Sequence, residues 1–147
     1  MTVSNHISRG IINHNPGNIR RGAKWDGLAL NQTDNEFCQF VDAEHGIRAI
    51  AMILISYQSI HGLNTVRGMI GRWAPPNEND TRGYAQFVAN NSGVGMDDPV
   101  SIHDLAFAAK MVPAMISMEC AHYQYPPDVV IRGLMLAGIG AGSLTRT

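Results

Sequence analysis

Glu119 is the residue of this sequence best suited to acid–base chemistry. It lies near the end of an apolar segment that contains Met111, Val112, Met115 and Ile116, and the sequence has only four glutamates. In a helix, Met115 and Ile116 precede it by four and three positions and lie on its face. We expect a carboxyl on such an apolar wall to be poorly hydrated when ionised, which suits a general acid at neutral pH. The alternative is a hydrated glutamate at a helix end.

A second carboxylate is needed where two acids share a reaction, and two glutamates are candidates. Glu44 is the first choice; like Asp42 it precedes a strongly predicted helix, where a carboxylate can instead stabilise exposed amides. Glu78 is the second choice, in the proline-containing turn WAPPNENDTRGY, and it has no evident structural role.

Aromatic residues that could stack on sugar rings are scattered along the chain; they are Trp25, Trp73, Tyr84, Tyr123 and Tyr125. Such side chains also bury large areas in protein cores, which is the alternative for each. The 6 histidines have no metal-ligand spacing, and Cys38 and Cys120 lie far apart in apolar surroundings. We therefore expect no metal site and no cofactor, and two buried thiols.

The elements that must position these residues are predicted to be helices. Apolar residues recur at helical spacing from Glu44 to Ile60, and again from Asn64 or Thr65 to Trp73. Further helices are expected over 81–91 and, after Asp128, over 129–138. Between them Ser101 and Asp104 resemble a capping box that opens a helix, and Pro113 must kink or split this helix, leaving a further element over 113–125. The first third of the chain is rich in turn-forming residues and has at most one short extended piece, EFCQFV.

Composition limits the class of protein. The chain has 147 residues and a formal net charge of -1, which argues against a nucleic-acid-binding protein. No apolar stretch is long enough to cross a bilayer, and the first residues have no secretory signal. We expect one domain over residues 1–147, mainly α-helical, with an irregular N-terminal lobe and at most a short β-hairpin, made in the cytoplasm and monomeric.

Four segments resemble a family of small bacteriophage proteins labelled virion structural proteins or lysozyme-like endolysins. They are NHNPGNIRRGAKWDGL, FCQFVDAEHGIRAIAMILISYQ, GMIGRWAPPNENDTRGYAQFVANNSGV and MVPAMISMECAHYQYP, which together lie within residues 9–139. The blocks NPGNIR…WDG, EFCQFV and ENDTRGYAQ are also similar to successive blocks of cell-wall glucosaminidases of the lysozyme superfamily. Those enzymes begin with a helix that ends in the catalytic glutamate, whereas here residues 1–14 contain no acidic residue. The block order implies a circularly permuted lysozyme-like domain with that helix ending at Glu119.

The resemblance implies roles for individual residues. Glu119 would be the general acid, with Glu44 or Glu78 as its partner, unless an N-acetyl or hydroxyl group of the substrate replaces the second carboxylate. Sugar-binding candidates are Asn15, Asn18, Trp25, Trp73, Tyr84 and Tyr123. We expect Glu119 and one of the other two glutamates to share a cleft that has Tyr84 or Trp73 on its wall.

Two functions follow from the resemblance. The first is an enzyme that cleaves the glycan strand of peptidoglycan, of lysozyme, lytic transglycosylase or glucosaminidase type. The alternative is a non-catalytic virion structural or cell-wall-binding protein with the same fold. The expected partners are bacterial peptidoglycan and other virion proteins, without nucleic acid or membrane insertion. The protein would be made in the host cytoplasm and would act on the wall in the periplasm, or be carried on the virion.

Overall fold

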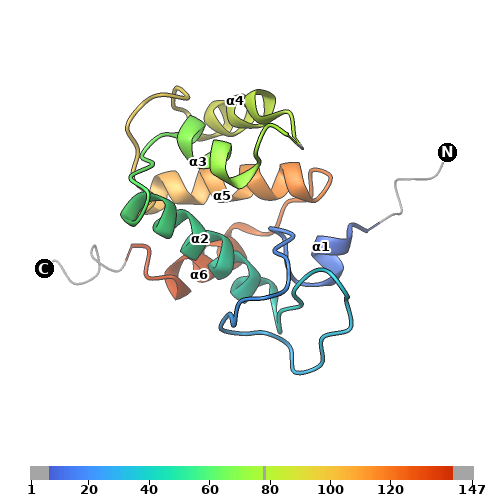
Figure 1. Ribbon diagram of the computed structural model, residues 1–147. Helices are drawn as coiled ribbons and strands as arrows, with labels where there is room; N and C mark the ends of the chain where they lie inside the picture. Colours follow the sequence, from blue (N-terminus) through green and yellow to red (C-terminus); the bar gives the residue numbers. More distant parts are fainter. Residues whose placement is uncertain (1–6, 78, 141–147) are drawn as a thin grey trace, which may run out of the picture.

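Outside an irregular N-terminal lobe, the described chain consists of helices joined by turns and loops (Figure 1). The computed structural model describes residues 7–77 and 79–140. Its helices are α1 (Arg9–Ile12), α2 (Ala43–Ser59), α3 (Val66–Trp73), α4 (Thr81–Ser92), α5 (Leu105–Glu119) and α6 (Pro127–Leu136). Within these residues the β-structure consists of isolated bridges such as Arg20 with Phe37. The predicted mainly helical chain is confirmed.

Helix α2 forms the centre of the helical part and packs against α3, α5 and α6. Ile47, Ile50 and Leu54 lie on its inner face and have no solvent exposure. The approach of α6 is close because Gly133 faces Ile47, and a Cβ there would lie 2.6 Å from the Ile47 Cγ2 atom. The predicted central position of this helix is confirmed.

Side-chain caps explain where α2, α3, α4 and α5 begin. Asp42 accepts a hydrogen bond from the His45 amide at the start of α2, and Thr65 and Asp80 do the same for α3 and α4. Asp104 caps α5, so the predicted start of that helix at Ser101 is three residues early. Helix α6 begins at Pro127 with Asp128 in its first turn, so the predicted cap at Asp128 is wrong.

Pro113 does not divide α5, so the predicted separate element over 113–125 is wrong; of the two outcomes expected at this residue, a kink or a split, the split does not occur. The helix continues from Leu105 to Glu119 with Pro113 inside it. Met111 and Met115, on either side of the proline, are fully buried. We attribute the continuity to this apolar packing, which offsets the backbone hydrogen bond that proline cannot make. As a result, Glu119 is the last residue of a helix that packs along its whole length.

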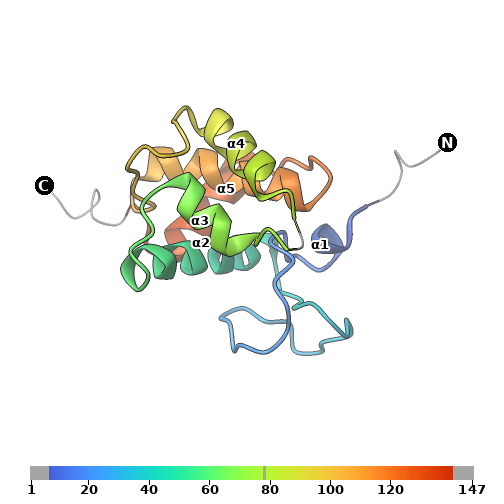
Figure 2. The same cartoon turned by 45° about the horizontal axis from the view of Figure 1, so that its top comes forward.

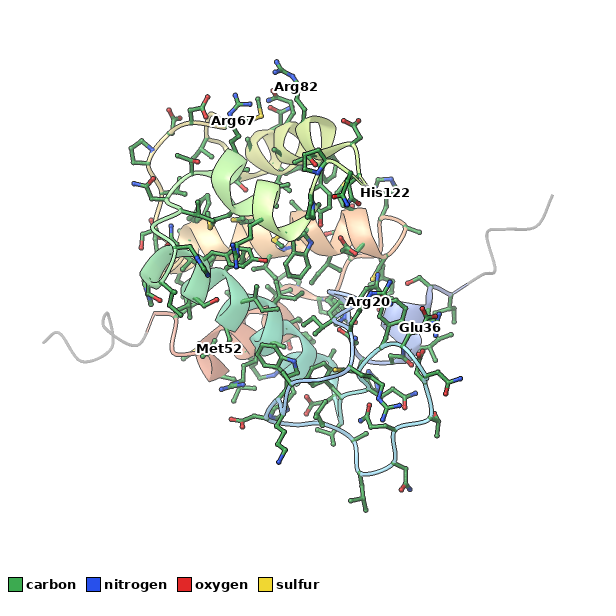
Figure 3. All side chains as sticks on the ribbon, viewed as in Figure 1. Arg20, Glu36, Met52, Arg67, Arg82 and His122 are labelled. Atoms are coloured by element: carbon green, nitrogen blue, oxygen red, sulfur yellow. The ribbon has the colours of Figure 1, made fainter. Side chains whose placement is uncertain are left out.

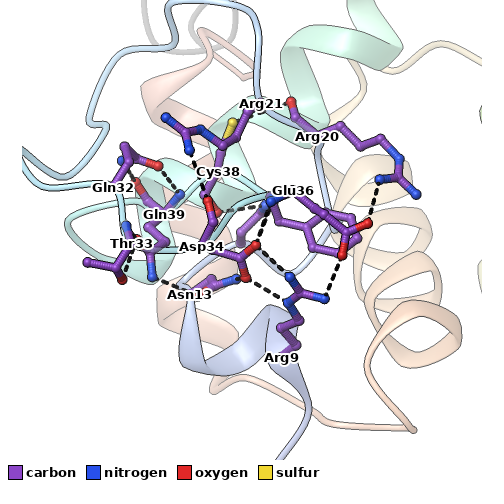
Figure 4. A network of polar contacts seen from close by, with 12 residues as sticks. Arg9, Asn13, Arg20, Arg21, Gln32, Thr33, Asp34, Glu36, Cys38 and Gln39 are labelled. Atoms are coloured by element: carbon purple, nitrogen blue, oxygen red, sulfur yellow. Dashed lines mark hydrogen bonds and ion pairs between the residues drawn. The ribbon is translucent and has the colours of Figure 1, made fainter.

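The irregular lobe, residues 13–41, extends away from the helices (Figure 2). Its centre is Asn15, which is fully buried and hydrogen bonds to the backbone of Ile19 and Cys38. At its outer side Asp34 accepts two hydrogen bonds of 2.6 Å from Arg9 and one from Asn13 (Figure 4). Specific polar contacts, rather than a sheet, therefore hold the lobe together.

Candidate active site

A cleft of about 650 Å³ lies between the lobe and the helices. The lobe contributes Asn18, Arg20 and Phe37, and the helices contribute Ile53 of α2 and Trp73 of α3. The remaining lining includes Glu119, which is partly exposed at the end of α5. Glu119 is the only carboxylate among the described residues that line this cleft. Its volume lies within the range of roughly 300–1,000 Å³ found for small-molecule sites.

Three hydrogen-bond donors surround the Glu119 carboxylate. The Tyr84 hydroxyl lies 2.9 Å from Oε2, the Trp73 Nε1 atom lies 3.2 Å from the same oxygen, and Asn18 Nδ2 lies 3.3 Å from Oε1. The expected apolar wall is therefore wrong, because Met115 and Ile116 are buried in the core. The donors fix the orientation of the carboxylate at the edge of the cleft.

Tyr84 is buried behind Glu119 and does not line the cleft. Its hydroxyl accepts the Trp73 N–H at 3.1 Å and donates to Glu119, so the three side chains form a chain of hydrogen bonds. Burial, followed by the neighbouring Glu119 carboxylate, raises the pKa of the Tyr84 phenol far above its usual range. Tyr84 therefore remains a hydrogen-bond donor to Glu119 at any pH at which the protein would act.

The chain turns sharply after Glu119. Ala121 and His122 both have positive φ, of 52° and 66°, which is unusual for residues other than glycine. The His122 amide donates to the Ser117 carbonyl, and the Cys120 thiol donates to the Pro16 carbonyl at 3.3 Å. Asn18 also donates to the Glu119 carbonyl at 3.2 Å. The end of α5 is thus attached directly to the lobe, which fixes the position of Glu119 at the boundary.

Glu44 does not share the cleft with Glu119, which corrects the first choice of a second carboxylate. Its Oε2 atom pairs with Arg132 at 3.1 Å, in a different groove formed with Asp42 and the end of α6. The ion pair and the position at the start of α2 give Glu44 a structural role. Glu78, the second choice, lies outside the described residues.

The sugar-binding candidates divide into two groups. Asn18 and Trp73 line the cleft. Asn15 has no exposed surface and its amide is fully used within the lobe, so it cannot contact a ligand. Trp25 packs against Cys38 and Phe40 in the small core of the lobe. The prediction that Asn15 and Trp25 bind sugar is therefore wrong, because both side chains lie inside the lobe that carries Asn18.

Tyr123 also lies away from the cleft. Its ring packs edge-on against Tyr125, with the ring centroids 4.8 Å apart, and neither residue lines the cleft. The two cysteines are free and buried, as predicted. No group of residues in the described part of the chain could hold a metal ion. Among the same residues, no helix has the length and apolar character needed to cross a bilayer.

A stack of charged and aromatic side chains at the rim was not predicted. The Phe37 ring lies beneath the guanidinium groups of Arg9 and Arg20, which are 4.7 Å and 5.0 Å from its centroid. Both arginines also pair with Glu36, and Figure 3 shows Arg20 beside Glu36 at the boundary of the lobe. The basic cluster IRRGAK, which contains Arg20, is the one signal in the sequence for this stack. Nothing in the sequence around Arg9 indicates its partner Asp34, which lies 25 positions away.

Comparison with known proteins gives one informative match. No protein-family model matches the chain. The chain is 39% identical over 136 residues to protein P5 of Pseudoalteromonas phage PM2, in an alignment that covers 90% of this chain and 83% of that protein. An alignment of this length extends over both the lobe and the helices.

Proposed function

Because the chain belongs to the same family as protein P5 of Pseudoalteromonas phage PM2, we propose that it is a bacteriophage protein that cleaves the glycan strand of peptidoglycan. The observation that supports cleavage is the position of Glu119, a partly exposed carboxyl at the edge of a 650 Å³ cleft. Glycoside cleavage requires such a carboxyl beside the glycosidic oxygen. Trp73 supplies aromatic surface for a sugar ring on the cleft wall.

In this proposal Glu119 gives its proton to the glycosidic oxygen while the bond from that oxygen to the anomeric carbon breaks. The resulting Glu119 carboxylate then takes a proton from the hydroxyl group or water that attacks the anomeric carbon, which restores the acid. Tyr84 and Trp73 stabilise the carboxylate between the two steps, because both can donate to Oε2. The N-acetyl or hydroxyl group of the substrate takes the place of a second carboxylate.

A non-catalytic virion component or wall-binding protein is the second candidate function. Two observations favour it. The relative is a phage protein, and both oxygens of Glu119 already accept hydrogen bonds within the chain, as they would in a structural carboxylate. In this case the cleft would bind the wall, or a neighbouring virion protein, without chemistry.

The loss of turbidity of purified peptidoglycan tests the proposal. We expect Glu119→Gln to keep its circular dichroism spectrum, because the amide is nearly isosteric, and to lower the rate at least about a hundredfold. Glu44→Gln is the matched control; it also removes one charge from a partly buried glutamate, but in another groove. We expect it to retain activity. Equal rates for Glu119→Gln and the unmodified protein, or no turbidity loss with either, would favour the second candidate.

A further inference from the structure

A second groove, of about 860 Å³, lies along α2 and α3. Its lining includes Tyr57 and Arg72, while the cleft contains Ile53 and Trp73. Tyr57 follows Ile53 by one turn of α2, and Arg72 immediately precedes Trp73 in α3. The cleft and this groove, which we call the side groove, are therefore neighbours on the same pair of helices. A branched polymer bound in the cleft would reach the side groove.

Arg72 gives the side groove a positive charge. Its guanidinium carbon lies 5.6 Å from the centroid of the Tyr57 ring, and its side chain is exposed. Among the described residues no carboxylate pairs with Arg72, although five other arginines form ion pairs; these are Arg9, Arg20, Arg48, Arg67 and Arg132. An exposed guanidinium held over an aromatic ring is suited to bind a carboxylate in a bidentate manner.

Gly71 leaves the floor of the side groove open. It lies inside α3, where glycine is less favourable than alanine, yet a Cβ at this position would meet nothing within 4 Å. At Gly68, by contrast, a Cβ would lie 3.2 Å from the Thr65 hydroxyl oxygen that caps the helix. No contact within the described protein therefore requires a glycine at position 71. A ligand that approaches the helix backbone closely would require it.

We infer that the side groove binds a carboxylate of the stem peptide that branches from the glycan strand. This inference rests on the proposed function, because it takes peptidoglycan as the ligand of the cleft. Where a stem peptide is attached, the lactyl carboxyl of N-acetylmuramic acid is part of a neutral amide, so the free carboxylates of the intact wall lie on the stem peptide. Arg72 therefore selects the peptide, and the groove makes the protein prefer wall whose stem peptides carry free carboxylates. The His61 imidazole, edge-on to Tyr57 with ring centroids 6.5 Å apart, borders the same site.

Cosedimentation with two materials tests the inference. One is intact peptidoglycan, and the other is the same material with its carboxylates converted to amides; removal of the peptides by an amidase would instead leave a free lactyl carboxylate on each N-acetylmuramic acid. All proteins carry Glu119→Gln so that the material is not degraded during the measurement. We expect Arg72→Gln to weaken binding to intact peptidoglycan about tenfold and to leave binding to the amidated material unchanged. Lys110→Gln is the matched control, with the same charge change at an exposed site on α5 outside the cleft and the side groove.

The outcomes separate this inference from the proposed activity. No effect of Arg72→Gln, an equal loss on both materials, or an equal loss with Lys110→Gln would overturn the inference, as would failure of the parent protein to bind intact peptidoglycan. A carboxylate-dependent effect without any turbidity loss in the cleavage assay would support the side groove and reject the enzyme. Gly71→Ala adds a second variant; we expect weaker binding to intact peptidoglycan from a well-folded protein, and unchanged binding would contradict close approach at Gly71.

Discussion

Tyr84→Phe tests whether the hydrogen-bonded chain behind Glu119 stabilises the fold. The substitution removes one oxygen and keeps the ring, which is 5% exposed and packs in the core. It deletes a hydrogen bond of 2.9 Å to the Glu119 carboxylate and one of 3.1 Å from Trp73 Nε1. The Trp73 N–H still has Glu119 Oε2 at 3.2 Å, so no buried donor loses its only partner.

The size of the effect follows from this geometry. A hydrogen bond to a charged group contributes about 1.5–3 kcal/mol to the free energy of unfolding. Because the Trp73 donor remains paired and Glu119 is partly exposed to water, we expect a loss near the lower end, about 1–2 kcal/mol. For a chain of this length the melting temperature should fall by roughly 3 to 6 °C.

Urea denaturation measures this loss. We expect the midpoint to fall with no change in the m-value, because the surface exposed on unfolding stays the same. The pH dependence gives a second readout. The pKa of Tyr84 is raised in the folded protein, so above the usual phenol pKa near 10 only the unfolded chain loses this proton. The stability of the unmodified protein should therefore fall as the pH rises above about 10, and Tyr84→Phe should fall less steeply.

Tyr123→Phe is the control, since this residue is 41% exposed and does not contact Glu119. It should leave the urea midpoint unchanged. An unchanged midpoint for Tyr84→Phe, or a loss no larger than that of Tyr123→Phe, would refute the reasoning. The hydrogen bonds around Glu119 would then make no net contribution to stability.

Three further substitutions test the packing and the lobe. Gly71→Ala should raise the free energy of unfolding by about 0.5–1 kcal/mol in urea denaturation, because the new methyl group meets open space; a decrease would contradict this. Gly46→Ala should lower it by about 2–3 kcal/mol, because a Cβ would collide with the His14 carbonyl oxygen; a neutral result would show that the lobe moves freely. The hydrogen-bonded Arg9 guanidinium lowers the pKa of Asp34 in the folded protein. The ionised Asp34 therefore stabilises the fold above the usual aspartate pKa, and this stabilisation is lost as the pH falls below that value. The Asp34→Asn protein should therefore be less stable than the unmodified protein at pH 7, and its free energy of unfolding should change less between pH 5 and 2. Urea denaturation at each pH measures this, and an equal pH dependence of the two proteins would argue against it.

The helices could be predicted because their signals are local. The helical spacing of apolar residues in α2 predicts its buried face, and Ile47, Ile50 and Leu54 are indeed buried. Asp80 can be identified as a cap because it directly precedes α4. Pro113 misleads the prediction because the penalty of a proline is local, whereas the packing of α5 that offsets it is not.

The site was predictable only in part, for the same reason. Residue type and position single out Glu119 and Trp73, and both lie in the cleft. Glu44 is a reasonable candidate until its partner Arg132, 88 positions away, is placed beside it. Asn15 has the residue type of a ligand-binding side chain, but its amide holds together a lobe that has no periodic pattern to predict. Contacts between residues distant in sequence decide such cases.

The attachment of the lobe to α5 also determines when the cleft can exist. Asn18 and Glu119 are separated by 101 positions, and Cys120 contacts Pro16 across 104. During translation the lobe and α2 leave the ribosome long before the carboxylate does. Closing so long a loop is among the slower steps of folding. A nascent chain therefore carries one wall of the cleft without Glu119, and the complete cleft arises only after the end of α5 has been synthesised.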